Sequence, residues 1–296
     1  MYIKSPLNYT GGKYKLLEKI IPGFPNENKC FVDLFTGGMN VGINVTADTI
    51  YANDQIDYLI ELYDYFQKTP TDEMIVAIKE KIEFYALDQQ NVDGYNRLRN
   101  DYNDKKNPLM LFVLTCYAFN HQIRFNNSLQ FNTPFGKDRS SYNASIENNL
   151  IRFSAALKEK NIILSSGDFR KFDFDKIGKG GVVYCDPPYL ITTGSYNDGK
   201  RGFGDWTEDE DSDLLALLDK LNDNGTFFAL SNVFYHKGKT NEGLIKWSEK
   251  YHVTYLDKKY SNCSYHFKDR DAKTVEVLVT NYTWEEMNCQ QMKLDL

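Results

Sequence analysis

Residues 31–42 read FVDLFTGGMNVG and predict a strand, a glycine turn and a helix in direct succession. The apolar run that begins at Phe31 is typical of a strand covered on both faces of a sheet. Gly37 and Gly38 permit a tight turn and let a ligand approach the backbone at a helix N-terminus. The glycines do not form G-x-G-x-x-G, so the fingerprint of a nicotinamide oxidoreductase is not met. One strand followed by one helix is the repeating unit of an α/β fold.

Further strands are predicted on both sides of this unit, and helical patterns alternate with most of them. The seven predicted strands span residues 30–35, 49–53, 162–166, 181–185, 226–230, 253–258 and 274–280. The alternation predicts the α/β class with a largely parallel sheet. The last two strands are separated by a polar loop without a helical pattern, so we expect them to pair antiparallel.

Residues 60–154 interrupt the alternation, because no strand of the core is predicted there. Helical patterns occur at 72–85 and 108–120, and a polar, aromatic, Asn-rich loop follows at 125–145. We interpret the block as an inserted, mainly helical domain. The predicted division is a core domain of residues 1–59 and 155–296 and an inserted domain of residues 60–154.

Composition places the chain among globular proteins, with 42% hydrophobic and 26% charged residues. Mean hydropathy is −0.54, and no apolar run approaches the ~18 residues of a membrane helix. The first residues, MYIKSP, lack the apolar region of a signal peptide. We therefore expect a soluble, cytoplasmic protein with no membrane partner.

The five cysteines and four histidines show no metal-binding pattern. They contain neither a C-x-x-C pair nor an H-x-x-x-H spacing. We therefore expect reduced thiols rather than a disulfide framework, and no zinc or iron site.

Charge is distributed unevenly along the chain, whose net charge is −6. Residues 97–139 carry seven Lys/Arg against three Asp, and residues 258–273 carry five against two. Residues 205–223 instead carry eight Asp/Glu against one Lys. Part of this acidic stretch is a capping box, in which Thr207 and Glu210 begin a helix. The two basic stretches are candidates for contacts with nucleic-acid phosphates, although such runs are usually solvated faces.

Residues 182–189 read VVYCDPPY and carry the most specific functional signal. The prolines disfavour helix at Asp186 and Pro187 and have no N–H, so the backbone offers only carbonyl oxygens. The carboxylate and a free carbonyl form a rigid acceptor pair at the end of a buried strand, and Tyr189 adds a flat ring. An exocyclic NH2 group on a planar base fits this set. The alternative is a Pro-Pro turn that only ends a strand.

Two further motifs predict contacts with a ligand at the same end of the sheet. Asp54 lies about 20 residues after the first motif, where an acidic side chain binds ribose hydroxyls. Residues 9–13, YTGGK, fail the phosphate-loop pattern G-x-x-x-x-G-K-[ST]. They place Tyr9 and Lys13 before a helix, where both can contact an anionic, partly aromatic ligand. The alternative for this stretch is a capped N-terminal helix.

Residues 119–126, FNHQIRFN, and 131–137, FNTPFGK, carry the side chains that read base edges. Arg, Asn and Gln form paired hydrogen bonds with bases, and they alternate here with apolar residues suited to wedge into a base stack. The alternative is a polar surface loop.

Taken in order, YTGGK, FVDLFTGG, AND, SSGDF and YCDPPY resemble the Dam-type (α-group, D12 class) DNA adenine-N6 methyltransferases. The stretches DPPYLIT, LSNVFYHKGK and KKYSNCSYH resemble the Dam enzymes of T-even bacteriophages most of all. The resemblance implies a seven-stranded, Rossmann-like methyltransferase core with an inserted target-recognition domain. It also implies S-adenosylmethionine as methyl donor, S-adenosylhomocysteine as product and double-stranded DNA as partner, in a bacterial cell or a phage-infected host. We expect no metal and a monomer in solution.

The resemblance assigns roles residue by residue. Catalysis is assigned to Asp186, Pro187, Pro188 and Tyr189. The methyl donor is expected to contact Tyr9, Lys13, Asp33, Phe35, Gly37, Gly38, Asp54, Asp168, Phe169 and Asp186. Among these, Asp54 is expected to hold the ribose, and Asp168 and Phe169 to lie beside the adenine ring. DNA is expected to contact Asn120, Gln122, Arg124, Asn126, Pro134, Lys137 and Arg139.

The sequence therefore predicts an enzyme that methylates N6 of a flipped adenine, with GATC as the expected site. Two positions depart from the phage pattern: Asp138 stands where those enzymes have Arg, and Gln122 where they have Met. Both departures concern base recognition. Two alternatives stay open, namely an N4-cytosine DNA methyltransferase and a catalytically silent DNA-binding regulator on the same scaffold.

Overall fold

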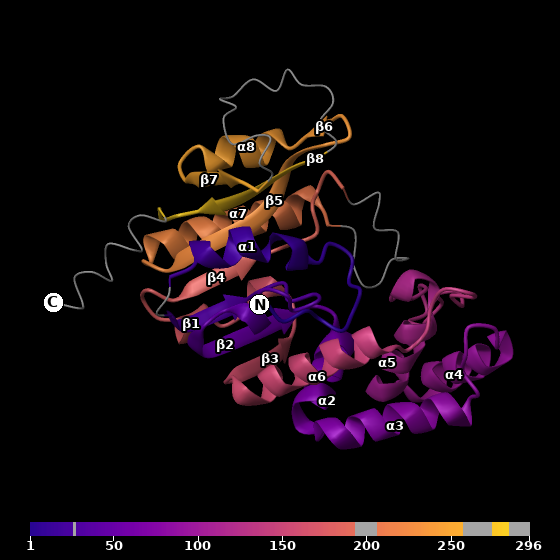
Figure 1. Cartoon of the computed structure of the whole chain (residues 1–296). Helices are drawn as coiled ribbons and strands as arrows, with labels where there is room; N and C mark the ends of the chain where they lie inside the picture. Colours follow the sequence, from indigo (N-terminus) through magenta and orange to yellow (C-terminus); the bar gives the residue numbers. More distant parts are fainter. Residues whose placement is uncertain (26–27, 193–205, 257–273, 284–296) are drawn as a thin grey trace.

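A mixed eight-stranded sheet forms the centre of the protein, with helices packed on both of its faces (Figure 1). The computed structural model describes residues 1–25, 28–192, 206–256 and 274–283, so the predicted basic stretch 258–273 lies outside the described residues. The strands are β1 (Asn28–Asp33), β2 (Ala47–Asp54), β3 (Ile162–Ser166), β4 (Val182–Cys185), β5 (Phe227–His236), β6 (Lys239–Thr240), β7 (His252–Tyr255) and β8 (Thr274–Thr280). Their order is β3-β2-β1-β4-β5-β8-β7, and β6 pairs with β5 outside this path.

The α/β class is confirmed, and each predicted strand overlaps a strand of the sheet. Strands β3, β2, β1, β4 and β5 run parallel, whereas β8 is antiparallel to both β5 and β7. The antiparallel pairing of the last two strands is thereby confirmed. The sequence pattern missed the two-residue strand β6 and the last six residues of β5. These residues pair with β8 and β6, which the local pattern does not specify.

Helices connect the strands. The α-helices are α1 (Leu17–Ile20), α2 (Asp57–Lys68), α3 (Thr71–Phe84), α4 (Val92–Lys105), α5 (Pro108–Tyr117), α6 (Ala144–Glu159), α7 (Glu208–Asp223) and α8 (Glu242–Ser248). The short 3-10 helices are η1 (Lys13–Leu16), η2 (Ile21–Gly23), η3 (Gly42–Asn44), η4 (Phe119–His121), η5 (Phe169–Lys171) and η6 (Phe174–Lys176). The predicted capping box begins α7, since Thr207 and Glu210 bond reciprocally. Among the described residues, no helix combines the length and apolar character needed to cross a bilayer.

Two hydrophobic clusters cover the two faces of the sheet. Neighbouring residues of β1 belong to different clusters, because side chains alternate along a strand: Phe31 lies in one and Val32 in the other. Helices α2 and α6 cover the first face, and α7 and α8 cover the second. Burial on both faces explains the near-continuous apolar strands that predicted the sheet.

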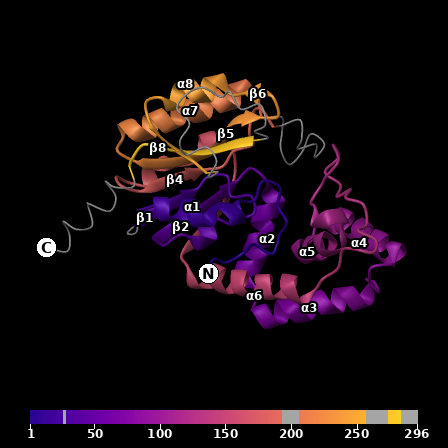
Figure 2. The same ribbon diagram turned by 45° about the horizontal axis from the view of Figure 1, so that its top comes forward.

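Helices α3, α4 and α5 gather to one side of the sheet in both views (Figures 1 and 2). Helix α2 links this group to the sheet, because it contacts α5, β2 and β3. Residues 60 and 154 lie inside α2 and α6, and one hydrophobic cluster extends from Phe31 to Phe112. Buried residues of the inserted block and of the core therefore belong to one hydrophobic cluster.

Three acidic residues meet at the carboxyl edge of the parallel strands. Asp33 ends β1, Asp54 ends β2, and Asp186 directly follows β4. Strands β2, β1 and β4 are neighbours in the sheet. This edge of an open α/β sheet is where ligands bind, so the topology itself brings the predicted carboxylates together.

Candidate functional site

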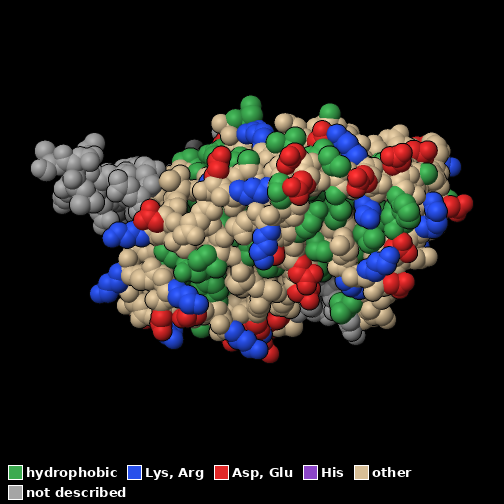
Figure 3. Space-filling view, turned by 90° about the horizontal axis from the view of Figure 1, so that it is seen from below, with side chains coloured by type: hydrophobic (Ala, Val, Ile, Leu, Met, Phe, Trp, Pro, Cys, Tyr) green, Lys and Arg blue, Asp and Glu red, His purple; other side chains and the backbone are tan. Residues whose placement is uncertain are grey.

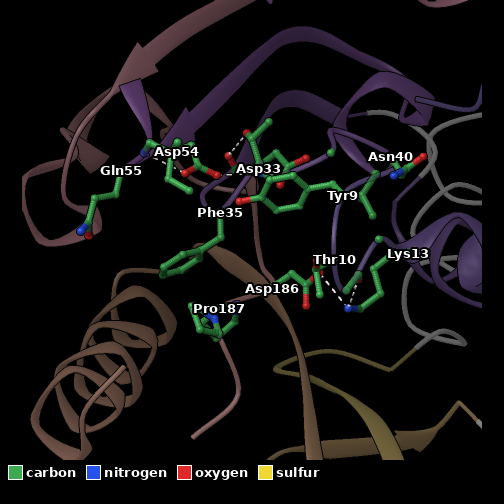
Figure 4. Close-up of a pocket in the computed structure, with 18 of the residues that line it drawn as sticks. Tyr9, Thr10, Lys13, Asp33, Phe35, Asn40, Asp54, Gln55, Asp186 and Pro187 are labelled. Atoms are coloured by element: carbon green, nitrogen blue, oxygen red, sulfur yellow. Dashed lines mark hydrogen bonds and ion pairs between the residues drawn. The ribbon is translucent and has the colours of Figure 1, made fainter. Parts of the chain in front are cut away.

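A cavity opens at this edge of the sheet, and most of the predicted catalytic and donor-binding residues line it (Figure 4). The predicted residues on its wall are Tyr9, Lys13, Asp33, Phe35, Gly37, Gly38, Asp54, Asp186, Pro187, Pro188 and Tyr189. The wall also contains Thr10, Gly11, Gly12, Thr36, Asn40, Val41, Gln55, Ile56, Tyr184, Trp206 and Glu210. Segments far apart in the sequence therefore form one site.

Asp186 is held by two side chains of the cavity wall. Lys13 Nζ lies 2.8 Å from Asp186 Oδ2 and points toward it in Figure 4. The Tyr189 hydroxyl donates a hydrogen bond of 2.9 Å to Asp186 Oδ1. The Lys13 ammonium also lies 5.0 Å from the centre of the Tyr189 ring, within cation–π range. Both carboxylate oxygens of Asp186 thus have a partner within the protein.

Burial raises the pKa of Asp186 above its ordinary value, and the charge and hydrogen bond of Lys13 and the hydrogen bond of Tyr189 partly offset this rise. Lys13 itself is buried, and its Nζ also donates to the Gly11 carbonyl at 2.9 Å. The sequence assigned Lys13 to the methyl donor. In the structure its ammonium pairs with the carboxylate of the YCDPPY motif and Lys13 lines the cavity, so its contact with the methyl donor stays a prediction.

The glycine turn is shaped by three contacts around Gly37. This residue has a φ of +44°, which side chains disfavour, and a Cβ there would lie 3.0 Å from the Tyr9 ring. Its N–H donates to Asp54 Oδ2 at 2.7 Å, and its carbonyl accepts from the Tyr63 hydroxyl at 2.6 Å. The second oxygen of Asp54 accepts from the Ile56 N–H at 2.9 Å. The turn and Asp54 therefore form one hydrogen-bonded unit.

The cavity is acidic, and its carboxylates are poorly solvated. Burial raises the pKa of Asp54 to about 6. Burial, together with the charges of Asp186 and Asp54, raises the pKa of Asp33 well above its ordinary value. Asp33 Oδ2 accepts from the Gly42 N–H at 2.9 Å. Within the described part of the chain, Asp33 Oδ1 is buried and has no hydrogen-bond partner.

This set of acceptors suits a ligand with hydroxyl donors and positive charge. Acidic side chains accept from hydroxyls and offset a cation, and bare glycines leave space against the backbone. A ligand with a ribose, an ammonium and a sulfonium has these groups. Among the described residues, no group of three or more His, Cys, Asp or Glu side chains is arranged to hold a metal ion.

Aromatic rings form part of the cavity wall. Phe35 lies beside Pro187 in Figure 4, and its ring centre lies 5.6 Å from that of Trp206. Trp206 Nε1 donates to the buried Asp211 at 3.0 Å, which fixes the indole at the start of α7. The sequence analysis missed Trp206 and Glu210. Their only signal was their position at the capping box, which we explained structurally.

Asp168 and Phe169 are the two predicted donor contacts that the cavity wall does not include. Phe169 is 4% exposed and packs behind Phe35 and Trp206. The Asp168 carboxylate accepts three hydrogen bonds from the Arg170 guanidinium, at 2.6 to 3.1 Å. The hydrogen bonds from the Arg170 side chain are the main reason that the pKa of Asp168 lies below its ordinary value. The Asp168 carboxylate is therefore bound by a side chain two residues further along the chain.

The predicted base-reading segment is a folded loop, which we call the recognition loop (residues 118–139). Antiparallel bridges join Ala118 to Phe135 and Phe125 to Phe131. Phe125 and Phe131 are 4% and 1% exposed, so they anchor the loop in the core. The Tyr58 ring of α2 lies 4.4 Å from that of Phe125. The loop is therefore anchored in the core, and its role in reading bases stays a prediction.

Most predicted DNA contacts point outward from the recognition loop. Asn120, Pro134, Lys137 and Arg139 are exposed, and Gln122, Arg124 and Asn126 are half-buried. Asn126 Oδ1 accepts from the backbone N–H groups of Ser128 and Gln130, so part of its side chain shapes the turn.

One contact within the recognition loop and two contacts to neighbouring segments hold it in place. The Arg139 guanidinium stacks 4.8 Å from the centre of the exposed Phe119 ring. The carbonyl of Asn120 accepts from the Asn8 side chain at 2.8 Å, which joins the loop to the segment that carries Tyr9 and Lys13. Asp138, the departure from the phage pattern, accepts from the Gln90 side chain.

The face that carries α3 and α6 differs from a DNA-binding surface. Seen from below, its described part shows Lys/Arg and Asp/Glu side chains interspersed with apolar ones (Figure 3). Phosphate binding depends on positive charge gathered in one place. The recognition loop is therefore the better candidate for a nucleic-acid interface.

Comparisons with known proteins identify the family of this chain. A family model described as "D12 class N6 adenine-specific DNA methyltransferase" matches residues 9–270. The chain is 50% identical over 282 residues to the type II methyltransferase M.FokI of Planomicrobium okeanokoites, covering 95% of this chain and 43% of that protein. It is 46% identical over 294 residues to the modification methylase StsI of Streptococcus sanguinis, covering 99% and 45%.

A DNA adenine methylase of Haemophilus influenzae is 30% identical over 187 residues, which are 62% of this chain and 63% of that enzyme. The chain spans less than half the length of M.FokI and of StsI.

Proposed function

Because this chain belongs to the D12 class of N6 adenine-specific DNA methyltransferases, we propose that it transfers a methyl group from S-adenosylmethionine to N6 of a flipped adenine in double-stranded DNA. One observation carries the proposal. Asp186, the two prolines and Tyr189 line the same cavity as the glycine turn and Asp54. An acceptor set for an amine thus adjoins an acceptor set for a ribose.

The fold supports a methyltransferase core with an inserted target-recognition domain. We assign the path β3-β2-β1-β4-β5-β8-β7 to a seven-stranded core and β6 to a hairpin added to β5. We assign residues 60–154 to target recognition. The grouping of α3, α4 and α5 beside the sheet supports this division (Figure 2).

The residues of the cavity fit the methyl donor. Asp54 accepts the ribose hydroxyls, the backbone at Gly37 and Gly38 borders the methionine part, and Asp33 offsets positive charge. When bound, S-adenosylmethionine supplies an electrophilic methyl group on a sulfonium. The aromatic wall at Phe35 and Trp206 excludes water from this part of the cavity.

The target adenine reaches the cavity only after it leaves the base stack. Tyr189 stacks on the flipped base, a contact worth about 1–3 kcal/mol. The Asp186 carboxylate and the Pro187 carbonyl accept the two N6 hydrogens, which directs the nitrogen lone pair toward the reacting carbon. Each Asp186 oxygen has one partner in the structure and keeps a further lone pair that can accept from the amine.

The recognition loop reads the DNA in this proposal. Exposed Lys137 and Arg139 contact phosphates, and Asn120, Gln122 and Arg124 contact base edges. Pro134 and the side chain of Asn126 border the same surface. The proposed target sequence is GATC, on the basis of the resemblance to T-even phage enzymes. The proposed location is the cytoplasm of a bacterial or phage-infected cell.

Asp186→Ala tests the assignment of the catalytic carboxylate. We expect DNA binding within twofold of the unaltered protein and loss of at least about a thousandfold in methyl transfer, because a positioned acceptor is removed. The readout is incorporation of tritiated methyl groups into duplex DNA. Asp173→Ala, which removes an exposed carboxylate paired with Lys176, is the control. Near-normal transfer by Asp186→Ala would refute the assignment.

Analysis of the product separates the remaining alternatives. Digestion of the methylated DNA to nucleosides is expected to yield N6-methyladenosine in its deoxy form. N4-methylcytosine would show the cytosine enzyme instead, and no incorporation would show a silent regulator. Mapping the methylated positions then tests GATC.

A further inference from the structure

Tyr63 is a fully buried residue that holds the glycine turn from behind. It lies on α2, is 0% exposed and does not line the cavity. Its hydroxyl donates a hydrogen bond of 2.6 Å to the Gly37 carbonyl. A buried hydroxyl requires a partner, but a helix could have buried a phenylalanine here without one. The hydroxyl also bonds the Ser5 side chain, and its contact with the Gly37 carbonyl supports the turn.

Gly37 has little other support. The peptide groups on its two sides are held by the Asp54 carboxylate at the N–H and by Tyr63 at the carbonyl. Its φ of +44° lies in the left-handed region, so the turn depends on such contacts to stay in place. Tyr9 packs directly against the missing Cβ. Movement of Gly37 would therefore displace both Asp54 and Tyr9, which line the cavity.

We propose that Tyr63 is a positioning residue for the methyl donor, which acts by fixing the Gly37 carbonyl and, through it, Asp54 and Tyr9. The inference rests on the proposed function, because it deepens the role of the same cavity. Tyr63 belongs to α2, which also contacts the recognition loop through Tyr58 and Phe125. Helix α2 thus supports the glycine turn of the cavity and also contacts the recognition loop.

The catalytic carboxylate is held independently of Tyr63. Asp186 follows β4, and its partners are Lys13 and Tyr189. Neither of these contacts involves α2. Loss of the Tyr63 hydroxyl should therefore weaken donor binding and leave the transfer step at saturating donor unchanged.

Tyr63→Phe tests the proposal, since it removes one oxygen and keeps the buried ring. We expect about tenfold weaker binding of S-adenosylhomocysteine by isothermal titration calorimetry, which corresponds to about 1.4 kcal/mol. The KM for S-adenosylmethionine should rise by a similar factor, while kcat and DNA affinity stay within twofold.

Tyr95→Phe is the matched control. Tyr95 is also 0% exposed, and its hydroxyl donates to a backbone carbonyl, that of Thr133, at 2.9 Å. Both variants lose a buried hydrogen bond and should show a similar fall in Tm. Only Tyr63→Phe should lose donor affinity.

Three outcomes overturn the inference. Unchanged binding of S-adenosylhomocysteine by Tyr63→Phe would show that the hydroxyl does not position the site. Equal losses in both variants would show general loosening of the fold. If the unaltered protein failed to bind S-adenosylhomocysteine, the proposed function would fail first, and this inference with it.

Discussion

At the scale of single residues, we expect Asp54 to make binding of the methyl donor sensitive to pH. Its carboxylate is buried, and its pKa is raised to about 6. The ionised form accepts hydrogen bonds from hydroxyl groups, so affinity is present above this pKa and is lost as the pH falls through it. We expect S-adenosylhomocysteine to bind about tenfold more weakly at pH 5 than at pH 7.

Calorimetric titrations across this pH range measure the effect, with Asp54→Asn as the control. The amide does not titrate, so its weaker binding should be nearly constant from pH 5 to pH 7. A pH profile of Asp54→Asn that matched that of the unaltered protein would assign the titration to another group.

Individual residues of the site were predictable where a motif and the topology agree. Asp54 and Asp186 end or follow neighbouring parallel strands, and such positions meet at one edge. Contacts between charged side chains were not predictable. Sequence spacing does not reveal that Arg170 engages Asp168, or that Lys13 reaches Asp186 across the cavity.

At the scale of elements, the start of α7 fixes the aromatic wall. Thr207 Oγ1 accepts from the Glu210 N–H at 3.3 Å, and the Glu210 carboxylate accepts from the Thr207 N–H at 3.0 Å. Thr207→Ala should lower the free energy of unfolding by about 1 kcal/mol, because it leaves an N-terminal amide without its cap. Urea titration followed by circular dichroism measures this change.

Glu210→Gln is the companion variant for the α7 cap. Glutamine also closes a capping box, so its loss of stability should be clearly smaller than that of Thr207→Ala. Equal losses would mean that the charge of Glu210, rather than the cap, stabilises this end of the helix.

The elements themselves were largely predictable because burial imposes regular patterns. Continuous apolar runs identified the buried strands, and the capping box identified α7. Helices α2, α4, α6 and α8 were missed, and the helix expected directly after Gly38 is only the short 3-10 helix η3. The apolar positions of α4 are sparse, and Gly94 interrupts them. The buried residues of α4, Tyr95, Leu98 and Tyr102, do follow a helical spacing.

At the scale of the whole molecule, DNA binding depends on charge that is local rather than net. The chain carries a net charge of −6, so a partner with many phosphates must meet a basic region. Lys137→Ala should weaken DNA binding similarly for all sequences and lower the slope of log Kd against log salt by about 1. Fluorescence anisotropy at several salt concentrations measures the slope.

Lys68→Ala provides the comparison for Lys137. Lys68 is an exposed lysine of α2 paired with Asp64, and it is not part of the recognition loop. Its removal should leave the salt slope unchanged. If both variants changed the slope equally, the recognition loop would not be the phosphate-binding surface.

The complete strand order could not be predicted from local sequence. Alternation of strands and helices predicts parallel neighbours, and it succeeds for β1 to β5. The position of β8 between β5 and β7 depends on pairing between segments that lie far apart in the chain. No periodicity within a single strand encodes that choice.

The place of β8 also has a consequence for biosynthesis. A chain emerging from the ribosome presents β5 and β7 well before residues 274–280 become available to join them. Until then each of the two strands exposes unpaired backbone N–H and C=O groups along one edge, and such edges can pair with other nascent chains. Translation that stops before residue 274 therefore yields a product prone to aggregate, even though every predicted catalytic residue has already been made.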